Sequence, residues 1–240
     1  MNEIQKQLTQ LRLHGMSSSW QSLLETKTNV ELSLSQGLSI LLQAEKQSRQ
    51  NRRFQRLTTK AKFRYQASIE EIVADASRGL GKELLATLAT GQYIENGQAI
   101  LITGATGCGK SFIASALGHQ GCALGHKVAY YNLQKLFVKT RMARLDGTIH
   151  KFMEGVFKTD LLILDDFGLS TIEPQYQLDL MEIMEDRHNR AATIIASQLP
   201  VAKWFDIIGE ATIADAILDR LVHTSYRVEL KGESRRKKNQ

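Results

Sequence analysis

The clearest chemical pattern in the sequence is GATGCGKS, at residues 104–111. It fits the P-loop pattern G-x-x-x-x-G-K-[ST] and lies between a short apolar run and a segment with helical period. Its glycines let the backbone turn N–H groups toward phosphate oxygens at a helix N-terminus. We expect Lys110 to reach the β- and γ-phosphates and Ser111 to ligate magnesium. The predicted nucleotide site comprises Gly104, Ala105, Thr106, Gly107, Cys108, Gly109, Lys110, Ser111 and Phe112.

A second pattern, LLILDDFG at residues 161–168, has four apolar residues followed by two carboxylates. This is typical of the Walker B strand that accompanies a P-loop. Asp165 is expected to hold magnesium at the carboxyl end of the strand, where ligands bind in open α/β sheets, and Asp166 to polarise the attacking water. A strand that simply ends in an acidic turn is the weaker alternative, because the motif follows Ser111 by 54 residues with a strand and helices between.

The stretch TIIASQLP, at residues 193–200, reads as another strand with a polar end. If this strand lies between the P-loop strand and the Asp165 strand, Ser197 or Gln198 would face the γ-phosphate. Either side chain could then sense hydrolysis through one hydrogen bond. A turn before Pro200 explains the same residues almost equally well.

An arginine that acts on the γ-phosphate of a neighbouring subunit can be worth ~10³–10⁵ in rate. Arg220, near the end of the amphipathic segment 215–223, is the first candidate, and Arg187 and Arg190 are rivals. Each could also form a local ion pair, and sequence spacing does not separate the two roles.

The elements that must position these residues alternate between strands and helices. Short apolar runs, which predict strands, occupy residues 99–103, 128–131, 161–165, 193–197 and 226–230. Segments of helical length separate them, so we expect a mostly parallel sheet covered on both faces. Residues 65–97 form a connector, with helical stretches predicted at 69–76 and 82–89 and a hinge at 79–82.

Residues 2–64 predict a small all-helical module. Gly15 is expected to separate the first two helices, and Ser17 to Ser19 offer N-caps for the second. Ser33 or Ser35 is expected to cap a third, longer helix that continues into a basic stretch. Its inward face would carry Leu34, Leu38, Leu41, Leu42 and Ala44. The predicted domains are residues 1–64 (helical), 65–230 (nucleotide-binding) and 231–240 (a basic tail).

Two segments are rich in positive charge. Residues 47–64 contain no acidic residue and seven basic ones, namely Arg49, Arg52, Arg53, Arg56, Lys60, Lys62 and Arg64. Residues 137–152 add Lys139, Arg141, Arg144 and Lys151 at roughly helical spacing. Either segment could be a solvated helix face or a surface for nucleic acid.

The distribution of charge favours nucleic acid. Residues 1–64 carry 11 basic and 4 acidic side chains and the last ten carry 5 and 1, whereas residues 65–230 carry 15 and 20. The two cysteines suit a reducing compartment. No apolar leader and no run approaching a membrane span is present, so we expect a soluble protein of the bacterial cytoplasm.

Longer stretches carry a resemblance to a known family. LRLHGMSSSWQSLLE, RRFQRLTTKAKFRY, YIENGQAILITGATGCGKSFIASALG, LLILDDFG and the segment from ASQLP to KGES resemble the IstB-type transposition helper ATPases. These belong to the AAA+ superfamily and are related to the DnaC helicase loaders. The resemblance implies an α/β fold with a parallel five-stranded sheet of order 5-1-4-3-2. It also implies a small all-α N-terminal domain and no substantial C-terminal lid.

The resemblance further implies an ATP- and magnesium-dependent ATPase that forms a homo-oligomer on double-stranded DNA. Arg220 would act in trans, DNA would stimulate hydrolysis, and the target DNA would be delivered to a partner transposase. Some positions depart from the family pattern. Asp166 is one methylene shorter than the usual glutamate, Ser197-Gln198 replaces the usual asparagine sensor, and Ala105, Thr106 and Cys108 alter the P-loop.

Two other functions compete with this one. A helicase loader would prefer single-stranded DNA, and a nucleotide-switched DNA-coating scaffold would hydrolyse little ATP. Single-strand binding usually relies on aromatic stacking, and residues 1–64 offer only Trp20, Phe54 and Phe63. This weakly favours the duplex.

Overall fold

The computed structural model describes residues 3–26, 32–223 and 225–232. The chain divides into two compact units, Met1–Arg56 and Leu57–Gln240, and the division falls within helix α3 (Leu34–Ala61). We describe each unit by itself. In the part of the chain that the structure describes, no helix combines the length and apolarity that a membrane span requires.

The first unit contains α1 (Glu3–Gln10), α2 (His14–Glu25) and most of α3. The chain breaks between α1 and α2 at Arg12, whose φ is 59°, and not at Gly15 as predicted. Gly15 lies inside α2 because that helix crosses α3 there: a Cβ on Gly15 would lie 2.4 Å from the Ala44 carbonyl oxygen. The helix therefore starts before the predicted serine caps.

The N-terminus of α2 receives its cap from another helix. Glu45 of α3 is buried, and its Oε2 accepts hydrogen bonds from the N–H groups of Gly15 (2.7 Å) and Met16 (3.2 Å). By contrast, the N-terminus of α3 is capped by residues close to it in the sequence. Ser33 Oγ accepts from the Gln36 N–H (3.3 Å), and Gln36 Oε1 accepts from the Ser33 N–H (2.9 Å). This reciprocal capping box selects Ser33 from the two predicted caps.

The predicted inward face of α3 is largely wrong. Leu34, Leu38 and Leu42 are 89%, 50% and 55% exposed. The short helix α2 covers only one side of α3, where Gly15 meets Ala44, Glu45 and Ser48, and leaves the leucine side uncovered.

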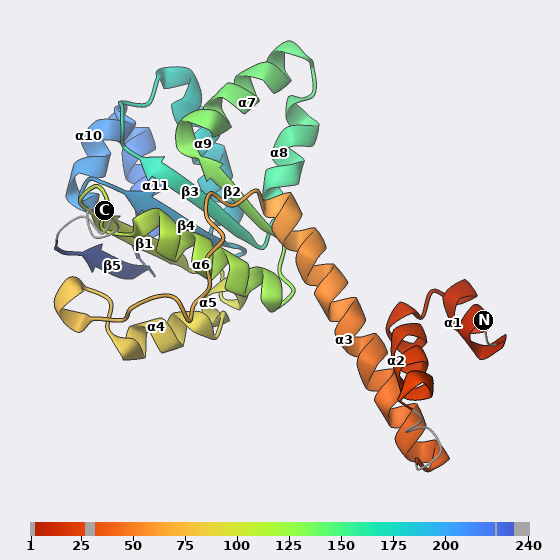
Figure 1. Cartoon of the computed structure of the whole chain (residues 1–240). Helices are drawn as coiled ribbons and strands as arrows, with labels where there is room; N and C mark the ends of the chain where they lie inside the picture. Colours follow the sequence, from red (N-terminus) through yellow and green to blue (C-terminus); the bar gives the residue numbers. More distant parts are fainter. Residues whose placement is uncertain (1–2, 27–31, 224, 233–240) are drawn as a thin grey trace. The chain divides into compact units, whose positions relative to one another are not determined.

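The second unit is built on a parallel sheet of order β2-β3-β4-β1-β5, which confirms the predicted order (Figure 1). The strands are β1 (Ala99–Gly104), β2 (Val128–Asn132), β3 (Leu161–Phe167), β4 (Ala192–Ser197) and β5 (Tyr226–Leu230). In register, Asn132 pairs with Asp165 and Thr103 with Ser197. The carboxyl ends of β2, β3, β4 and β1 therefore meet at one edge of the sheet.

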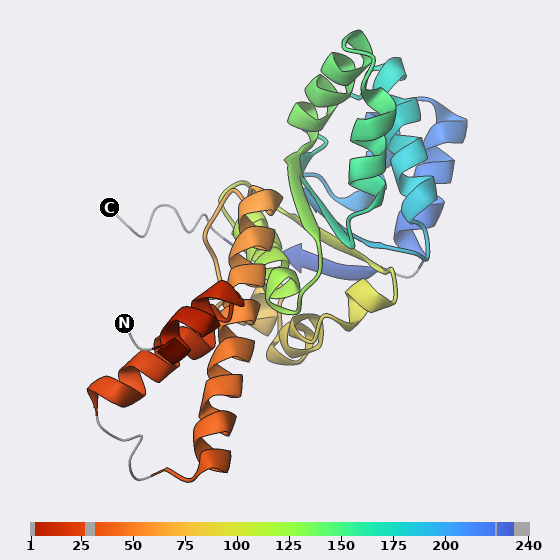
Figure 2. The same ribbon diagram turned by 90° about the vertical axis from the view of Figure 1, so that its right-hand side faces the viewer.

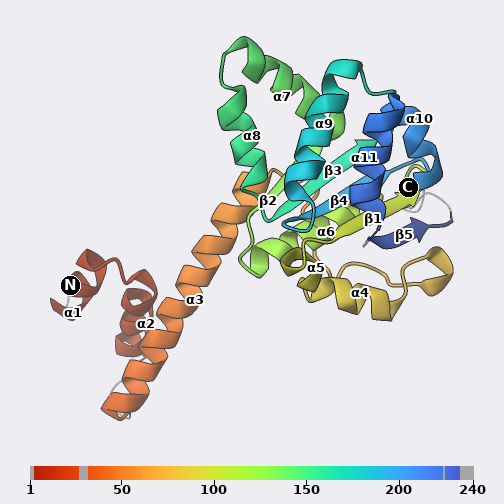
Figure 3. The ribbon, with the colours of Figure 1, turned by 180° about the vertical axis from the view of Figure 1, so that it is seen from behind.

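Helices cover both faces of the sheet. On one face lies α6 (Lys110–Ala123), with α4 (Lys82–Ala89) and α5 (Gln92–Glu95) beside it (Figure 1). On the other face, seen in front of the sheet in Figure 3, lie α7 (Leu133–Leu145), α8 (Ile149–Phe157), α9 (Pro174–Arg187), α10 (Trp204–Ile208) and α11 (Ala211–Val222). Figure 2 shows these later helices, coloured green to blue, grouped on one side.

The alternation of side chains along β3 explains why its sequence is apolar throughout. Leu162 and Leu164 join the core with α7 to α11, whereas Leu161 and Ile163 contact the glycines of α6. Four successive apolar residues are needed because both faces of the strand are covered.

The connector differs from its prediction. The helix predicted at 82–89 is α4, but residues 69–75 are not helical. Local hydrogen bonds stabilise a non-helical backbone here. Glu71 accepts from the Ser68 N–H (2.8 Å), and Asp75 caps the 3-10 turn Ala76–Arg78 and forms a β-bridge with Leu80. Gly79, placed at a hinge by the prediction, packs tightly, since a Cβ there would lie 1.9 Å from the Glu229 carbonyl oxygen.

Candidate nucleotide-binding site

The P-loop joins β1 to α6 and depends on its glycines. Gly104, Gly107 and Gly109 have φ values of 145°, 84° and 107°, a region that other residues rarely adopt. A Cβ on Gly104 would also lie 2.4 Å from the Leu230 carbonyl oxygen of β5. Gly109 is the N-cap of α6, so the loop leads directly into a helix N-terminus, where N–H groups and the helix dipole favour an anion.

Lys110 lies folded within this loop. Its side chain is buried, and Nζ donates to the carbonyl oxygens of Gly104 (2.8 Å) and Ala105 (2.9 Å). The amine is therefore held next to the loop by weak neutral acceptors. Phosphate oxygens carry full charge and form stronger hydrogen bonds with an ammonium group.

The structure brings together the two residues predicted to hold magnesium. Ser111 Oγ donates to Asp165 Oδ1 at 3.0 Å, and Asp165 is 1% exposed at the end of β3. Hydroxyl and carboxylate oxygens are ligands that magnesium prefers, so the donor set fits this ion. The Tyr130 hydroxyl donates to Asp165 Oδ2. Burial, reinforced by the charge of Asp165, raises the pKa of Tyr130 and keeps this hydroxyl protonated.

Asp166 has an unusual backbone that turns its side chain into the site. Its φ is 58°, and the β3–β4 register shifts between Leu164 and Phe167. The Asp166 N–H donates to Asp165 Oδ1 at 2.9 Å, and the Asn132 side-chain amide donates to Asp166 Oδ2 at 2.8 Å. Sequence reasoning missed Asn132. The sequence feature that could have identified Asn132 is its position as a polar residue directly after the predicted strand at 128–131.

Arg64 lies at the same carboxylates. Its guanidinium donates to Asp165 Oδ2 (3.2 Å) and Asp166 Oδ2 (3.0 Å), whereas the sequence grouped it with the DNA-binding cations. Burial lowers the pKa of Arg64, but the hydrogen bond to Asp165 and the charge of Asp166 outweigh burial and raise it. No local pattern links residue 64 to residues 165 and 166, so this contact could not be found from the sequence.

The two predicted sensor residues have different surroundings. Ser197 is fully buried; its Oγ donates to the Phe167 carbonyl oxygen (2.8 Å) and accepts from the Leu199 N–H (3.0 Å). Gln198 Oε1 instead accepts from the Thr106 hydroxyl of the P-loop at 2.7 Å. Only Gln198 of this pair contacts a P-loop side chain among the described residues.

Some of these residues, namely Arg64, Lys110, Ser111, Asp166 and Gln198, line a cavity of about 680 Å³, a size that suits a nucleotide. The P-loop lines it from Thr106 to Phe112. The connector supplies another wall through Tyr65, Ile72, Val73, Arg78 and Leu80, which sequence reasoning did not identify. The rings of Tyr65 and Phe112 lie 6.4 Å apart. Tyr65, Ile72, Val73 and Leu80 give this wall apolar and aromatic area of the kind that a purine base packs against, and Glu71, Asp75 and Arg78 add charged groups to it.

The three candidate arginines are now distinguishable. Arg187 is buried and donates to Thr193, Thr159 and Ala192, so it is part of the core. Arg190, in the turn that follows α9, pairs with Asp186 near the end of that helix. Arg220 NH2 donates to Glu185 Oε1 at 3.0 Å with a quarter of its side chain exposed.

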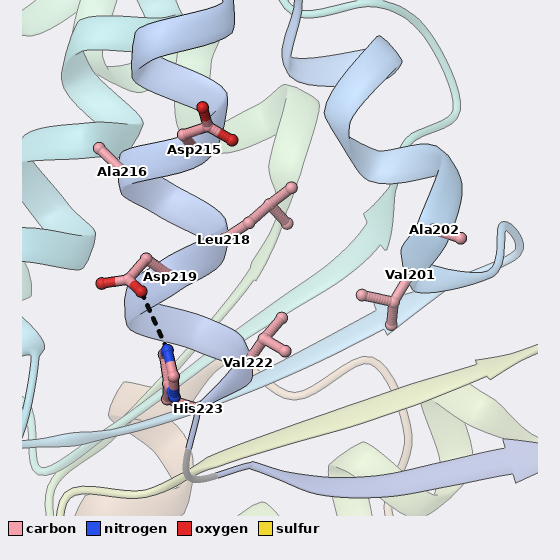
Figure 4. Close-up of a pocket in the computed structure, with 8 residues that line it drawn as sticks. All are labelled: Val201, Ala202, Asp215, Ala216, Leu218, Asp219, Val222 and His223. Atoms are coloured by element: carbon pink, nitrogen blue, oxygen red, sulfur yellow. Dashed lines mark ion pairs between the residues drawn. The ribbon is translucent and has the colours of Figure 1, made fainter.

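A shallow groove of about 710 Å³ lies along α11, between that helix and the segment at Val201 (Figure 4). Its wall includes Asp215, Asp219 and His223, and the last two form an ion pair at 3.2 Å. The groove contains no P-loop residue, so it is separate from the nucleotide cavity.

The predicted DNA-binding cations also differ from one another. Arg49 and Arg52 contact buried Glu45, and Arg144 binds buried Asp179 through both terminal nitrogens. Lys139 lies over the Tyr131 ring at 4.9 Å. The side chains of Arg53, Arg56, Lys60, Lys62 and Arg141 are exposed.

The site and the sheet together define a class of protein. A P-loop between β1 and α6, two carboxylates at the end of β3 and the sheet order β2-β3-β4-β1-β5 are those of AAA+ P-loop proteins. The family model of IstB-like ATP binding proteins matches residues 6–240. The chain belongs to this family.

Individual relatives agree with this assignment. An insertion sequence ATP-binding protein (y4pL) of Sinorhizobium fredii is 40% identical over 230 residues, covering 96% of this chain and 94% of the relative. The IS21 ATP-binding protein of Pseudomonas aeruginosa is 27% identical over 238 residues, covering 99% and 90%.

Solved structures share the fold. The DnaC helicase loader superposes with a TM-score of 0.57 at 17% identity, covering 70% of this chain and 98% of the loader. DnaA from Aquifex aeolicus, bound to AMPPCP, superposes with a TM-score of 0.60 at 19% identity, covering 72% and 52%. Both likenesses concern the fold alone.

Proposed function

We propose that this chain is an ATPase that binds double-stranded DNA, assembles on it with ATP, and serves a transposase as a target-DNA helper. The observation that carries the proposal is that Ser111 of the P-loop and the Asp166 N–H both form hydrogen bonds with Asp165 at the end of β3. The chain also belongs to a family of ATP-binding proteins. Relatives named as insertion sequence ATP-binding proteins support the connection to transposition.

The residues of the cavity suggest how hydrolysis to ADP and phosphate would proceed. Lys110 would leave its carbonyl acceptors for the phosphates, and Ser111 with Asp165 would hold magnesium. Bound magnesium supplies positive charge that offsets the negative charge of the phosphates. Asp166, oriented by Asn132, would position and polarise the attacking water. Gln198 would report the state of the phosphates through its contact with Thr106.

The active site is proposed to be shared between subunits of a homo-oligomer. Arg220 would exchange Glu185 for the γ-phosphate bound by a neighbour, which is easier than extracting buried Arg187. The test is complementation: Arg220→Ala and Asp166→Ala should each lack turnover alone and recover part of it when mixed, because Asp166→Ala is expected to keep nucleotide binding. Mixtures that stay inactive would assign Arg220 a role within its own subunit.

The first experiment is nucleotide binding and steady-state turnover with duplex DNA, single-stranded DNA or none. We expect wild-type protein to bind ATP, to hydrolyse it faster with duplex and to form larger particles with both ligands. Lys110→Ala should lose binding and assembly. Asp166→Ala should keep binding but lose about 10²-fold or more in turnover, since a positioned base contributes typically 10²–10⁴-fold.

The outcomes separate the competing functions. Assembly by Lys110→Ala with ATP, or parental turnover by Asp166→Ala, would overturn the roles given to these residues. Stimulation and assembly on single strands instead of duplex would support the helicase-loader alternative. Assembly on DNA with negligible turnover would support a nucleotide-switched scaffold.

A further inference from the structure

Arg64 is held at the metal-binding carboxylates by the packing of its neighbours. The Phe63 ring packs at a tilt against His119, with ring centroids 4.2 Å apart, and forms an edge contact with Tyr130 at a centroid distance of 6.2 Å. Gly118 makes room for it, because a Cβ there would lie 2.4 Å from the Phe63 ring. On the other side, the carbonyl oxygen of Tyr65 lies 3.3 Å from His119 Nε2. The backbone around Arg64 is therefore anchored, and its side chain extends to the ends of β3.

The carboxylates need a positive partner whenever magnesium is absent. Asp165 is 1% exposed, and Asp166 follows it directly with its carboxylate aimed at the same place. An uncompensated buried carboxylate is strongly destabilising. Among the described residues, Arg64 is the cation that contacts either carboxylate; Lys110 donates to carbonyl oxygens of the P-loop instead.

Arg64 and magnesium would compete for the same oxygens. Asp165 Oδ1 accepts from Ser111, and Oδ2 already accepts from both Tyr130 and Arg64. A divalent ion ligated by Asp165 would stand within a few ångströms of the guanidinium, and two cations so close repel each other. The arginine side chain is 41% exposed, so it can leave by rotation without disrupting the core.

We propose that Arg64 is a positioning residue that serves as the counter-ion of Asp165 and Asp166 when magnesium–ATP is absent, and that its withdrawal is required for these carboxylates to serve the metal and the water. This inference rests on the proposed ATPase function. It means that Arg64 sets how much magnesium is needed to load the site, because each binding event must displace the resident cation.

The test is a magnesium titration of nucleotide binding, followed with a fluorescent N-methylanthraniloyl derivative of ATP. In Arg64→Gln the magnesium concentration for half-maximal binding should fall about three- to tenfold, the range that the net contribution of one typical hydrogen bond implies for this partly exposed arginine. Arg64→Lys keeps the positive charge and should remain close to wild type. Arg78→Gln is the matched control, since Arg78 lines the same cavity but donates to the Lys231 carbonyl oxygen instead of the carboxylates. Whatever this variant does to nucleotide affinity, it should leave the magnesium concentration for half-maximal binding unchanged.

A second readout needs no nucleotide. In EDTA, Arg64→Gln should melt at a lower temperature than wild type and Arg78→Gln, and magnesium alone should restore part of the loss. An unchanged or higher magnesium requirement in Arg64→Gln would overturn the inference. So would an equal loss of nucleotide affinity with and without magnesium, which would make Arg64 a phosphate ligand. Failure of wild-type protein to bind nucleotide would instead refute the proposed function, while the melting experiment would still test the counter-ion role.

Discussion

Two basic segments of this protein have similar composition and different surroundings. In the segment 47–64, cations near both ends contact carboxylates: Arg49 and Arg52 contact buried Glu45, and Arg64 contacts buried Asp165 and half-buried Asp166. In helix α7, Arg144 at the end of the helix binds Asp179, whereas Arg141, three residues earlier, forms no ion pair with any residue that the structure describes. Each segment therefore mixes cations that hold the structure together with cations available to a polyanion.

The difference shows that a run of positive charge is not one functional unit. A cation paired with a buried carboxylate is needed for stability, because removing it leaves a charge uncompensated. Among the residues that the structure describes, Lys60, Lys62 and Arg141 form no ion pair, so they are the better candidates for phosphate contacts. Three changes test this division, ordered from the largest expected effect.

The largest effect should come from replacing Lys60, Lys62 and Arg141 together by glutamine. Duplex affinity should fall on the order of a hundredfold, and the salt dependence should flatten by about 0.9 per lost phosphate contact. Fluorescence anisotropy over a series of salt concentrations measures both. The matched control replaces Arg49, Arg52 and Arg144 and should leave the slope nearly unchanged. Equal losses in the two triple variants would contradict the division.

An intermediate effect is expected from Arg144→Ala on stability. Asp179 is 1% exposed, so losing its partner should lower the free energy of unfolding by about 2 kcal/mol. Arg141→Ala on the same helix should change it by less than about 0.5 kcal/mol. Urea unfolding compares the two variants. Adding Asp179→Asn to Arg144→Ala should recover part of the loss, and no recovery would mean that the buried charge is not the cause.

The smallest effect concerns Glu45→Gln in the first unit. Burial raises the pKa of Glu45, but the hydrogen bond from Arg49 and those from the Met16 and Gly15 N–H groups outweigh burial and lower it from 4.5. The stabilisation is therefore complete above that pH and is lost as pH falls through the lower folded value. We expect a loss of about 1 kcal/mol at neutral pH in the variant.

The pH dependence of unfolding provides the check on this interpretation of Glu45. Wild-type protein should lose more stability than Glu45→Gln as the solution is acidified below the ordinary glutamate pKa. Parallel pH profiles would show that Glu45 is not a charged cap of α2.

Local patterns predicted much of the second unit. The five strands agree with the sequence, because a strand covered on both faces must be apolar throughout and a P-loop must join a strand to a helix. Their order agrees with what the family resemblance implied. The prediction of a helix in the connector failed at residues 69–75. There the side chains of Glu71 and Asp75 accept hydrogen bonds from nearby N–H groups, and these bonds stabilise a non-helical backbone. The prediction of the buried face of α3 failed because the spacing of apolar residues gives the period of a helix, but it does not show which other elements pack against that helix.

By itself, the sequence determined the chemistry that is local to the chain: a glycine-rich phosphate loop, adjacent carboxylates at a strand end, and a serine cap for α3 at Ser33 or Ser35. These depend on backbone geometry over a few residues. Only the tertiary structure decided which charges meet. Arg64 contacts residues about a hundred positions away, and Gln198 rather than Ser197 contacts the P-loop. Such contacts depend on how strands and helices pack, and packing alone sorts this chain's cations into counter-ions and free surface charges.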